Sequence, residues 1–338
     1  MEFNLFKVVN NGTRNVIEFE NRLPFESVVW KEKFVEAGTV QAVFAKTDEA
    51  LALLKVGKFC TLTPAQGANL AYIHSIKING DKITVYGSEA KALWKRKGKI
   101  NLAPEGTVNL KTKIEAALKS AMFTFADADV IIPSLGTANL DALEYASVYE
   151  YVCEILESAS AGWTASLDEQ SGTIQIFARK GVDKSDTVQF ATIFGNAADY
   201  SYTADSSGYV NSVTAVGLDG KAIVTETVTR AGDTTGETYS AYLDLRTEFP
   251  READVTLADY KAALRERAQM SLIARYAREK PDVVGDVSTE GFGTDYALGD
   301  IVAVYIHELG LNVNCRVTSS TRVIEDGLDT TTISLEKV

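Results

Sequence analysis

Short alternating runs joined by tight, glycine-containing turns constrain the fold of this chain most strongly. Residues 72–78 and 82–86 are strand-like and flank Asn79-Gly80-Asp81, a sequence that favours a β-hairpin turn. Residues 2–9 and 15–20 flank the turn Asn10-Asn11-Gly12 in the same way. Further strand-like runs cover residues 40–44 and 57–62. Residues 1–100 are therefore predicted to form a β-domain.

The pattern changes after Gly87. A short helix is expected over residues 89–96, with Ala90, Leu93 and Trp94 on one face and Lys91 among the cations around it. Residues 101–185 are then predicted to form a small α+β insert. Its expected elements are a helix over 111–122, a longer helix capped by Asn139 or Asp141 and ending near Ser158, and a hairpin of residues 163–167 and 173–178.

Strands return from about residue 186, and residues 186–338 are predicted to form a third domain. The runs 187–194, 210–217 and 222–230 have an extended pattern. A helix is predicted over 256–279, where Thr256 and Asp259 resemble a capping box. Two hairpins are predicted to close the chain, one joining 300–304 to 311–318 and one joining 319–324 to 330–335. The sequence thus predicts an α+β protein that is mainly β.

Two segments far apart in the chain share one pattern. Val56-Gly57-Lys58 and Leu298-Gly299-Asp300 each place an aliphatic residue, a glycine and a charge before an extended run. Each run is followed by a strand, a glycine-containing hairpin turn and a threonine-rich strand. Either the two β-rich ends are copies of one fold, or a common strand-turn-strand pattern has occurred twice. The pattern alone leaves both explanations open.

The charge and cysteine content argue against two classes of protein. The chain has 338 residues with 46 acidic and 34 basic side chains, a net charge of −12. This balance argues against a protein that holds nucleic acid by neutralising phosphates. Cys60, Cys153 and Cys315 are widely spaced in apolar runs, as expected of buried core residues and not of a disulfide framework. Neither a secretion signal nor a membrane span is predicted.

Residues that could carry catalytic chemistry are few or scattered. His74 and His307 are expected in a strand and a turn, without the spacing of a metal site. A cell-wall hydrolase could draw a catalytic pair from four carboxylates, although turn and cap roles suit these residues better. They are Asp127, Asp129, Asp168 and Glu169. We assign no catalytic, cofactor-binding or metal-binding residue and no cofactor, and we predict that the chain is not an enzyme.

Polar segments supply candidate contact surfaces. The candidate partner-contact residues are Arg230, Asp233, Thr235 and Glu237 in one loop and Asn10 and Asn11 in the first turn. A basic cluster consists of Lys95, Arg96, Lys97 and Lys99. It is either a solvated helix end, whose cations complement the helix dipole, or a contact patch for an acidic partner.

A cluster of tyrosines suggests a different class of function. Tyr200, Tyr202 and Tyr209 lie beside serine and aspartate residues. They could stack on a glycan, which would make the chain a cell-wall-binding module, or they could pack across a sheet.

Several local patterns occur together along the whole chain. The N-terminal ones are an aromatic residue before an extended segment (30–44), a glycine-led strand (57), an Ile-x-x-Ile hairpin (73–76) and a small-residue helix ending in arginine (87–96). The C-terminal ones are 236–240, the helix with Tyr260, Ala268 and Leu272, 296–300 and 316–318. Their order resembles the tail hub, or baseplate hub, family of long-tailed bacteriophages and related tail-like injection machines.

The resemblance implies two tail-tube-like β-barrel or β-sandwich domains, each with an associated helix, flanking the α+β insert. It also implies a homotrimer whose two tube-like domains alternate around a ring, matching a sixfold tail tube on one side and a threefold tip on the other. The implied partners are the tail tube or distal tail protein, the tape-measure protein and a tail fibre or spike protein. DNA would pass through the channel without sequence-specific binding, and no stable membrane insertion is implied. The implied location is the tip or baseplate of the virion tail, after assembly in the host bacterial cytoplasm.

Overall fold

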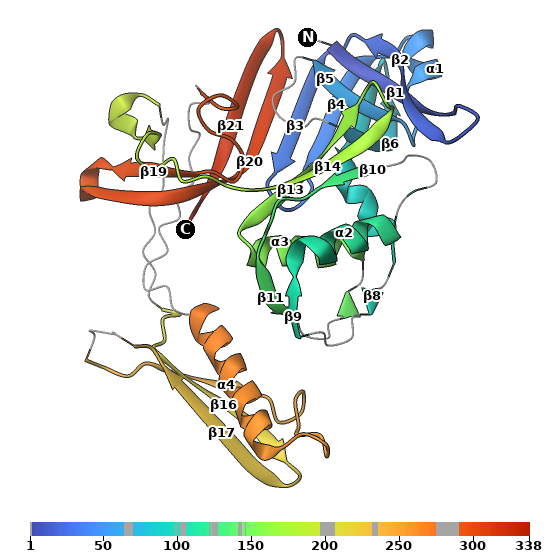
Figure 1. Ribbon diagram of the computed structural model, residues 1–338. Coiled ribbons are helices and arrows are strands. Elements are labelled where there is room, and N and C mark those ends of the chain that lie inside the picture. The colour runs from blue at the N-terminus through green and yellow to red at the C-terminus, as the bar shows by residue number, and fades with distance from the viewer. Residues whose placement is uncertain are drawn as a thin grey trace. The chain divides into compact units, whose positions relative to one another are not determined.

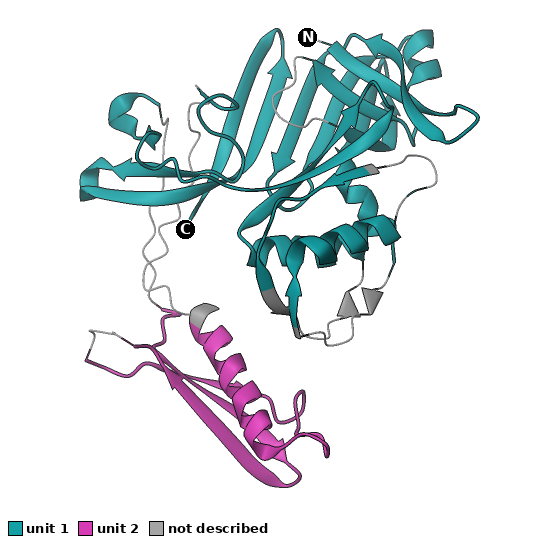
Figure 2. Ribbon diagram, in the orientation of Figure 1, with its two compact units in different colours: residues 1–200, 283–338 teal, residues 201–282 magenta. Residues whose placement is uncertain are grey.

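The computed structural model describes residues 2–63, 70–98, 100–101, 106–121, 123, 128–140, 144–145, 147–196, 207–231, 236–274 and 291–338. The chain divides into two compact units, one formed by residues 1–200 with 283–338 and one by residues 201–282 (Figure 2). The division into domains 1–100, 101–185 and 186–338 stays a prediction. The predicted α+β, mainly β class is confirmed by the element content.

A large, mostly antiparallel sheet forms the centre of the first unit (Figure 1). Among the described residues it has eleven strands, in the order β15-β19-β20-β3-β4-β7-β6-β5-β1-β2 with β21 paired to β20. The strands are β1 (Glu2–Asn10), β2 (Asn15–Leu23), β3 (Ser27–Lys33), β4 (Thr39–Ala45), β5 (Phe59–Thr63), β6 (Ala71–Asn79), β7 (Lys82–Glu89), β15 (Gln189–Phe190), β19 (Ile301–Ile306), β20 (Leu311–Glu325) and β21 (Leu328–Lys337). Within this described part β2 and β15 do not pair, so the sheet is open and is not a closed barrel.

The core of this sheet follows from side-chain alternation. Val28 and Trp30 on β3 and Phe44 on β4 point to one buried face, and the Phe3 ring meets the Phe44 ring edge-on at 5.1 Å. Helix α1 (Asp48–Leu53) adds to this core and begins at Thr47, whose hydroxyl accepts a hydrogen bond from the Ala50 amide. The hairpins predicted in the first hundred residues are therefore confirmed, because their turns join the paired strands β1–β2 and β6–β7.

Strand β20 differs from the sequence-based expectation. It was expected as two strands, 311–318 and 319–324, but it is one strand with a bulge between Val317 and Ser319. Its first part pairs with β19, and its second part pairs with β3 in the register Ser319↔Lys33 to Glu325↔Ser27. Strands from the two ends of the chain therefore share one sheet.

The strand expected over 187–194 is largely wrong. Only β15 pairs there, and Thr192–Phe194 form a short 3-10 helix, η2, that ends at Gly195 with φ of +70°. The Asn196 side chain accepts the Ala191 amide and donates to the Gln189 carbonyl, so it satisfies backbone groups that a longer strand would pair.

The described part of the insert combines two helices with three small sheets. The helices are α2 (Leu110–Ser120) and α3 (Val148–Ser158), and the strands are β8 (Ile100–Asn101), β9 (Gly106–Asn109), β10 (Ala128–Ile131), β11 (Thr137–Leu140), β12 (Glu144–Tyr145), β13 (Ala161–Asp168) and β14 (Thr173–Lys180). The sheets are β10-β14-β13, β11-β9 and β12-β8. The predicted cap of the longer helix is wrong, because Ser147 and Glu150 form a capping box and α3 begins at Val148. Asn139 lies in β11 instead, and Asp141 lies outside the described residues.

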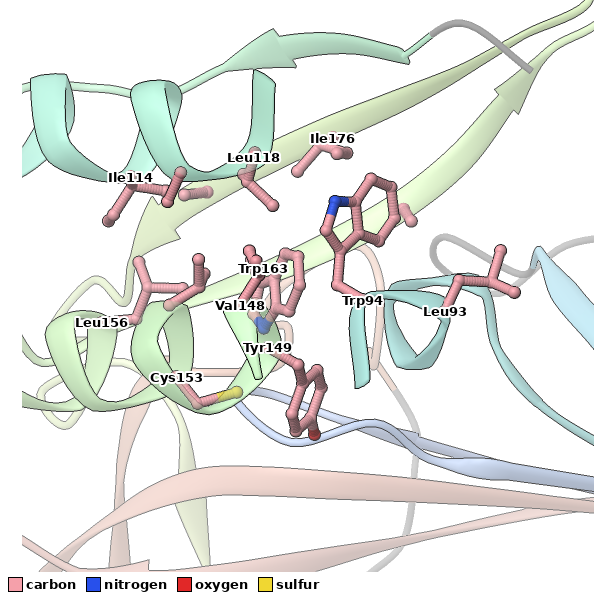
Figure 3. Packing of buried hydrophobic residues seen from close by; sticks show 14 of the residues in the cluster. Leu93, Trp94, Ile114, Leu118, Val148, Tyr149, Cys153, Leu156, Trp163 and Ile176 are labelled. Carbon is pink, nitrogen blue, oxygen red and sulfur yellow. The ribbon is translucent and has the colours of Figure 1, made fainter. Parts of the chain in front are cut away.

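The short helix expected over 89–96 is a 3-10 helix, η1 (Ala90–Arg96). It has about three residues per turn, so Lys91 and Trp94 lie on the same side and both are buried. The expectation that Lys91 lies on the polar side was wrong for this reason. Figure 3 shows Trp94 reaching into the core between α2, α3 and the β13–β14 hairpin, where its ring lies 6.2 Å from the Trp163 ring.

The second unit is a three-stranded sheet with one helix. Its described strands are β16 (Ser212–Asp219), β17 (Ala222–Thr229) and β18 (Ser240–Asp244), in the order β17-β16-β18, and its helix is α4 (Leu257–Ala274). Tyr260, Leu264, Ala268 and Leu272, spaced four residues apart, pack on the sheet as their spacing predicts. None of the described helices in either unit is long and apolar enough to cross a membrane.

Candidate interaction surfaces

The segment between β3 and β4 fastens the insert to the large sheet. The Trp163 backbone amide donates to the Phe34 carbonyl at 3.0 Å, and its indole Nε1 donates to the Val35 carbonyl at 2.8 Å. The Ala37 amide donates to the Tyr149 hydroxyl at 2.6 Å. A Cβ at Gly162 would lie 2.3 Å from the Phe34 ring, so glycine is needed there. The insert is thus held through specific backbone contacts.

A buried lysine lies at the same junction between the large sheet and the insert. Lys91 Nζ donates to the carbonyls of Lys33 at 2.6 Å and Trp163 at 2.9 Å, and lies 3.5 Å from a Glu89 carboxylate oxygen. Glu89 also accepts the Gly38 amide. Burial raises the pKa of Glu89 and lowers the pKa of Lys91. Lys91 therefore joins β3, β7 and the insert at one point, which sequence patterning did not reveal.

A second buried carboxyl lies where β3 meets β20. Burial raises the pKa of Glu32 well above its ordinary value, and Glu89 raises it further, while Lys91 and Arg322 oppose the rise. Arg322 on β20 forms a two-pronged ion pair with Asp329 at 2.9 and 2.8 Å. Glu32 Oε1 accepts no hydrogen bond from the described residues. Burial therefore favours the protonated form of this carboxyl where β3 meets β20.

The basic cluster lies at the end of η1, and three of its cations contact aromatic rings. Lys95 Nζ lies 4.6 Å from the Tyr149 ring centre, and Lys97 Nζ lies 4.4 Å from that of Phe123. The Arg96 guanidinium lies 5.0 Å from the Tyr72 ring centre and donates to its hydroxyl at 3.3 Å. Lys99 lies outside the described residues. These cations tie η1 to its neighbours, and a role as a patch for an acidic partner stays a prediction.

The first candidate contact turn is exposed and well defined. Asn10 Oδ1 accepts the Gly12 amide at 2.8 Å, and Asn11 Oδ1 accepts the amides of Thr13 at 3.1 Å and Arg14 at 3.0 Å. Both asparagines are exposed. The turn thus presents a fixed polar surface, and its contact with a partner stays a prediction.

The second candidate loop is closed at its base by a residue that the sequence did not single out. The Asn211 carbonyl accepts the Arg230 amide at 2.9 Å, and its side chain donates to the Glu237 carbonyl at 2.7 Å and accepts the Tyr239 amide at 2.8 Å. Asp233 and Thr235 lie outside the described residues. Asn211 therefore fixes where the loop leaves and rejoins the sheet, and the loop's partner role stays a prediction.

The carboxylates proposed for hydrolysis have mainly turn contacts. Asp168 accepts the Ser171 hydroxyl at 2.7 Å and the Gln170 amide at 3.0 Å, and these hydrogen bonds lower its pKa. A glycosidase acid needs a raised pKa, so Asp168 does not fit that role. Asp129 on β10 accepts a hydrogen bond from Thr173 at 3.5 Å. Glu169 is exposed in the turn, and Asp127 lies outside the described residues.

Within the described residues, the remaining candidates do not come together as a chemical site. His74 is exposed on β6, and His307 begins the 3-10 helix η3 (His307–Leu309), 6.1 Å from the Tyr305 ring. No three His, Cys, Asp or Glu side chains gather as a metal site in the part of the chain that the structure describes. Tyr209 is buried and its ring lies 5.8 Å from the Tyr239 ring, whereas Tyr200 and Tyr202 lie outside the described residues.

The two segments with a shared sequence pattern have the same backbone geometry. In the first meander (β5, β6 and β7), the Gly57 amide donates to the Ile73 carbonyl at 2.9 Å and the Ile73 amide donates to the Lys58 carbonyl at 2.9 Å. In the second meander (β19, β20 and β21), Gly299 and Val317 form the first bond at 2.7 Å, and Val317 and Asp300 form the second at 2.9 Å.

The likeness extends beyond these bonds. Gly57 and Gly299 have φ of +97° and +89°, a region that favours glycine. A bulge follows in the central strand of each meander, between Ile73 and Ser75 and between Val317 and Ser319. The sequence repeat is therefore also a repeat in the structure. This favours duplication of a meander over a chance recurrence of the pattern.

Comparison with known proteins agrees with this fold. The sequence matches the family described as Siphovirus ReqiPepy6 Gp37-like protein over residues 20–335. The structure is similar to a tail protein from Neisseria meningitidis MC58, with a TM-score of 0.59, 14% identity and coverage of 100% of this chain and 97% of that one. It is also similar to the 43 kDa tail protein of prophage MuSo2 from Shewanella oneidensis, with a TM-score of 0.57, 14% identity and coverage of 99% and 98%.

A third similar structure is prophage tail protein gp18 from Listeria monocytogenes, with a TM-score of 0.56, 12% identity and coverage of 99% of this chain and 94% of that one. No curated protein matches the sequence. At these identities the likeness to solved structures concerns the fold. The mainly β fold of tail proteins is thereby confirmed, whereas the described strands form an open sheet and no closed barrel.

Proposed function

This chain belongs to the family of Siphovirus ReqiPepy6 Gp37-like proteins, and we propose that it is the structural hub that ends a phage tail tube. The hub adapts the sixfold symmetry of the tube to a threefold tip and forms part of the channel for DNA. It acts as a homotrimer at the tail tip or baseplate of the virion, after assembly in the host bacterial cytoplasm.

One observation carries this proposal: a single chain holds two meanders with two equivalent backbone hydrogen bonds, a positive-φ glycine and a bulge each. Three such chains in a ring present six similar meanders, which is what a sixfold tube requires of its end piece. The same ring has exact symmetry that is only threefold, which suits a fibre or spike on the other side. The internal repeat thus supports the adaptor role from the geometry of one chain.

The proposed neighbours follow from the position at the end of a tube. They are the tail tube or distal tail protein, the tape-measure protein and a tail fibre or spike protein. The net charge of −12 supports a channel through which DNA slides, because an acidic wall repels phosphates. The proposed role is mechanical and not enzymatic.

The mass of the purified chain in solution tests the trimer, by light scattering at several concentrations. The proposal predicts a species of three chains. A single chain at every concentration would favour a cell-wall-binding module or a hydrolase, which binding and digestion of purified cell wall would then distinguish. Tail assembly after loss of the chain tests the role separately, since the proposal predicts tails that fail to complete their tip.

A further inference from the structure

The central strand of the first meander has an open edge beyond its bulge. Strand β6 pairs with β7 along its length, but β5 reaches only Tyr72 and Ala71 on the other side. Among the described strands nothing pairs with this side of residues 75–79. Ile76 packs partly against the core, whereas Ile78, on the same face, is 53% exposed. The apolar face of β6 therefore extends beyond the part of the strand that pairs with β5.

The second meander shows what covers the equivalent edge. Residues 319–325 follow the same bulge in β20, and β3 pairs with them in antiparallel register. Counting from the bulges, Arg322 occupies the position of Ile78, and Trp30 of β3 lies opposite it. At the equivalent positions, Ser319 and Arg322 are buried, whereas Ser75 and Ile78 are exposed. One repeat is thus completed by a strand that the other repeat lacks.

We propose that the β6 edge, residues 75–79, receives an antiparallel strand from a second copy of this chain, as β20 receives β3. This inference rests on the proposed function, because a ring of identical chains places the first meander of one copy beside the second meander of the next. The internal β3–β20 contact then supplies the template for the contact between copies. The strand from the second copy places an apolar side chain opposite Ile78, just as Trp30 lies opposite Arg322.

The backbone of β6 identifies which groups make this contact. Gly80 and Asp81 form a two-residue turn, so Asn79 and Lys82 are the pair that closes the hairpin. Backbone groups of an antiparallel strand alternate between its two sides, so those of Ile76 and Ile78 face the open edge. Lys77 lies between them, and an edge lysine discourages pairing with unrelated strands. The edge is therefore available to a matched strand and protected from others.

Ile78→Pro tests the proposal, with Ile78→Ala as its matched control. Proline removes the outward amide but no bond to β7, whereas alanine removes the side chain and keeps the amide. The proposal predicts that Ile78→Pro raises the concentration for half-assembly by at least about tenfold, and Ile78→Ala by less. Light scattering measures the assembly, and thermal unfolding checks that the single chain stays folded. Ile78→Asp is the second variant, because a charge at this exposed position opposes assembly without straining the backbone.

The outcomes separate this proposal from the proposed function. Three-chain particles that form equally well with Ile78→Pro and Ile78→Asp overturn the edge contact but leave the ring in place through another surface. A wild-type chain that stays single up to about 0.1 mM, yet is required for tail assembly, overturns pairing between copies and leaves the tail role intact.

Discussion

The two meanders share two backbone hydrogen bonds beside their leading glycines but differ in their surroundings. The residue after each glycine forms an ion pair with a neighbouring strand, yet the charges are reversed: Lys58 pairs with Glu20 on β2, and Asp300 pairs with Arg179 on β14. The first meander leads into η1 and the insert, whereas the second is covered by β3. The backbone pattern is thus set by local sequence, whereas the burial of each copy depends on the elements that pack against it.

The largest expected effect concerns the buried lysine of η1, the 3-10 helix that follows the first meander. Lys91→Met leaves the buried Glu89 carboxylate without its cation, and we expect a loss of about 3–5 kcal/mol in the free energy of unfolding. Urea unfolding measures this loss. Lys95→Met, at an exposed position of the same 3-10 helix, is the control and should cost less than about 1 kcal/mol. Equal effects of the two variants would contradict the junction described for Lys91.

The next test compares the two equivalent glycines directly. Alanine at either position adopts an unfavourable positive φ, at a cost of about 1–2 kcal/mol. A Cβ at Gly299 would also lie 2.1 Å from the Phe34 ring, whereas at Gly57 the nearest atom is the Tyr72 hydroxyl at 3.8 Å. We therefore expect Gly299→Ala to cost about 1–3 kcal/mol more than Gly57→Ala in urea unfolding. If the two variants lose the same stability, the surroundings of the copies do not differ as described.

The local features of both meanders could be predicted from sequence, whereas their surroundings could not. Asn79-Gly80 and Asp326-Gly327 mark tight turns, and the spacing of Tyr260 and Leu264 marks a helix face, because these signals act within a few residues. The pairing of β3 with β20 depends on residues almost three hundred positions apart. In the sequence Lys91 resembles a surface cation, because its buried position depends on the 3-10 geometry of η1.

A smaller effect concerns the carboxyl where β3 covers the second meander. The folded chain raises the pKa of Glu32, so its stabilising contribution is complete below the ordinary carboxyl pKa and is lost as the pH rises through the raised value. Glu89, Lys91 and Arg322 face the same carboxyl. Glu32→Gln stays neutral at every pH. We expect its melting temperature to exceed that of the wild type more at about pH 8 than at about pH 5. A difference that does not change with pH would contradict the raised pKa.

The smallest effect concerns the link between η1 and β6. The Arg96 guanidinium stacks on Tyr72 at 5.0 Å, and Arg96→Ala should cost about 0.5–1 kcal/mol. Lys77→Ala on the exposed part of β6 is the control and should change stability by less than about 0.5 kcal/mol. Urea unfolding of both variants measures the difference. A neutral Arg96→Ala would show that this contact adds nothing to the stability of the first meander.

The central claim is that the two meanders of each chain take equivalent places in a ring of three chains. Averaged electron micrographs of the purified particle test it most directly, because they show both the number of chains and the symmetry of the ring. The account predicts a closed ring with threefold symmetry and six similar lobes, alternating between the two meanders. A ring with another number of chains, or three lobes with the second meanders outside the ring, would contradict it.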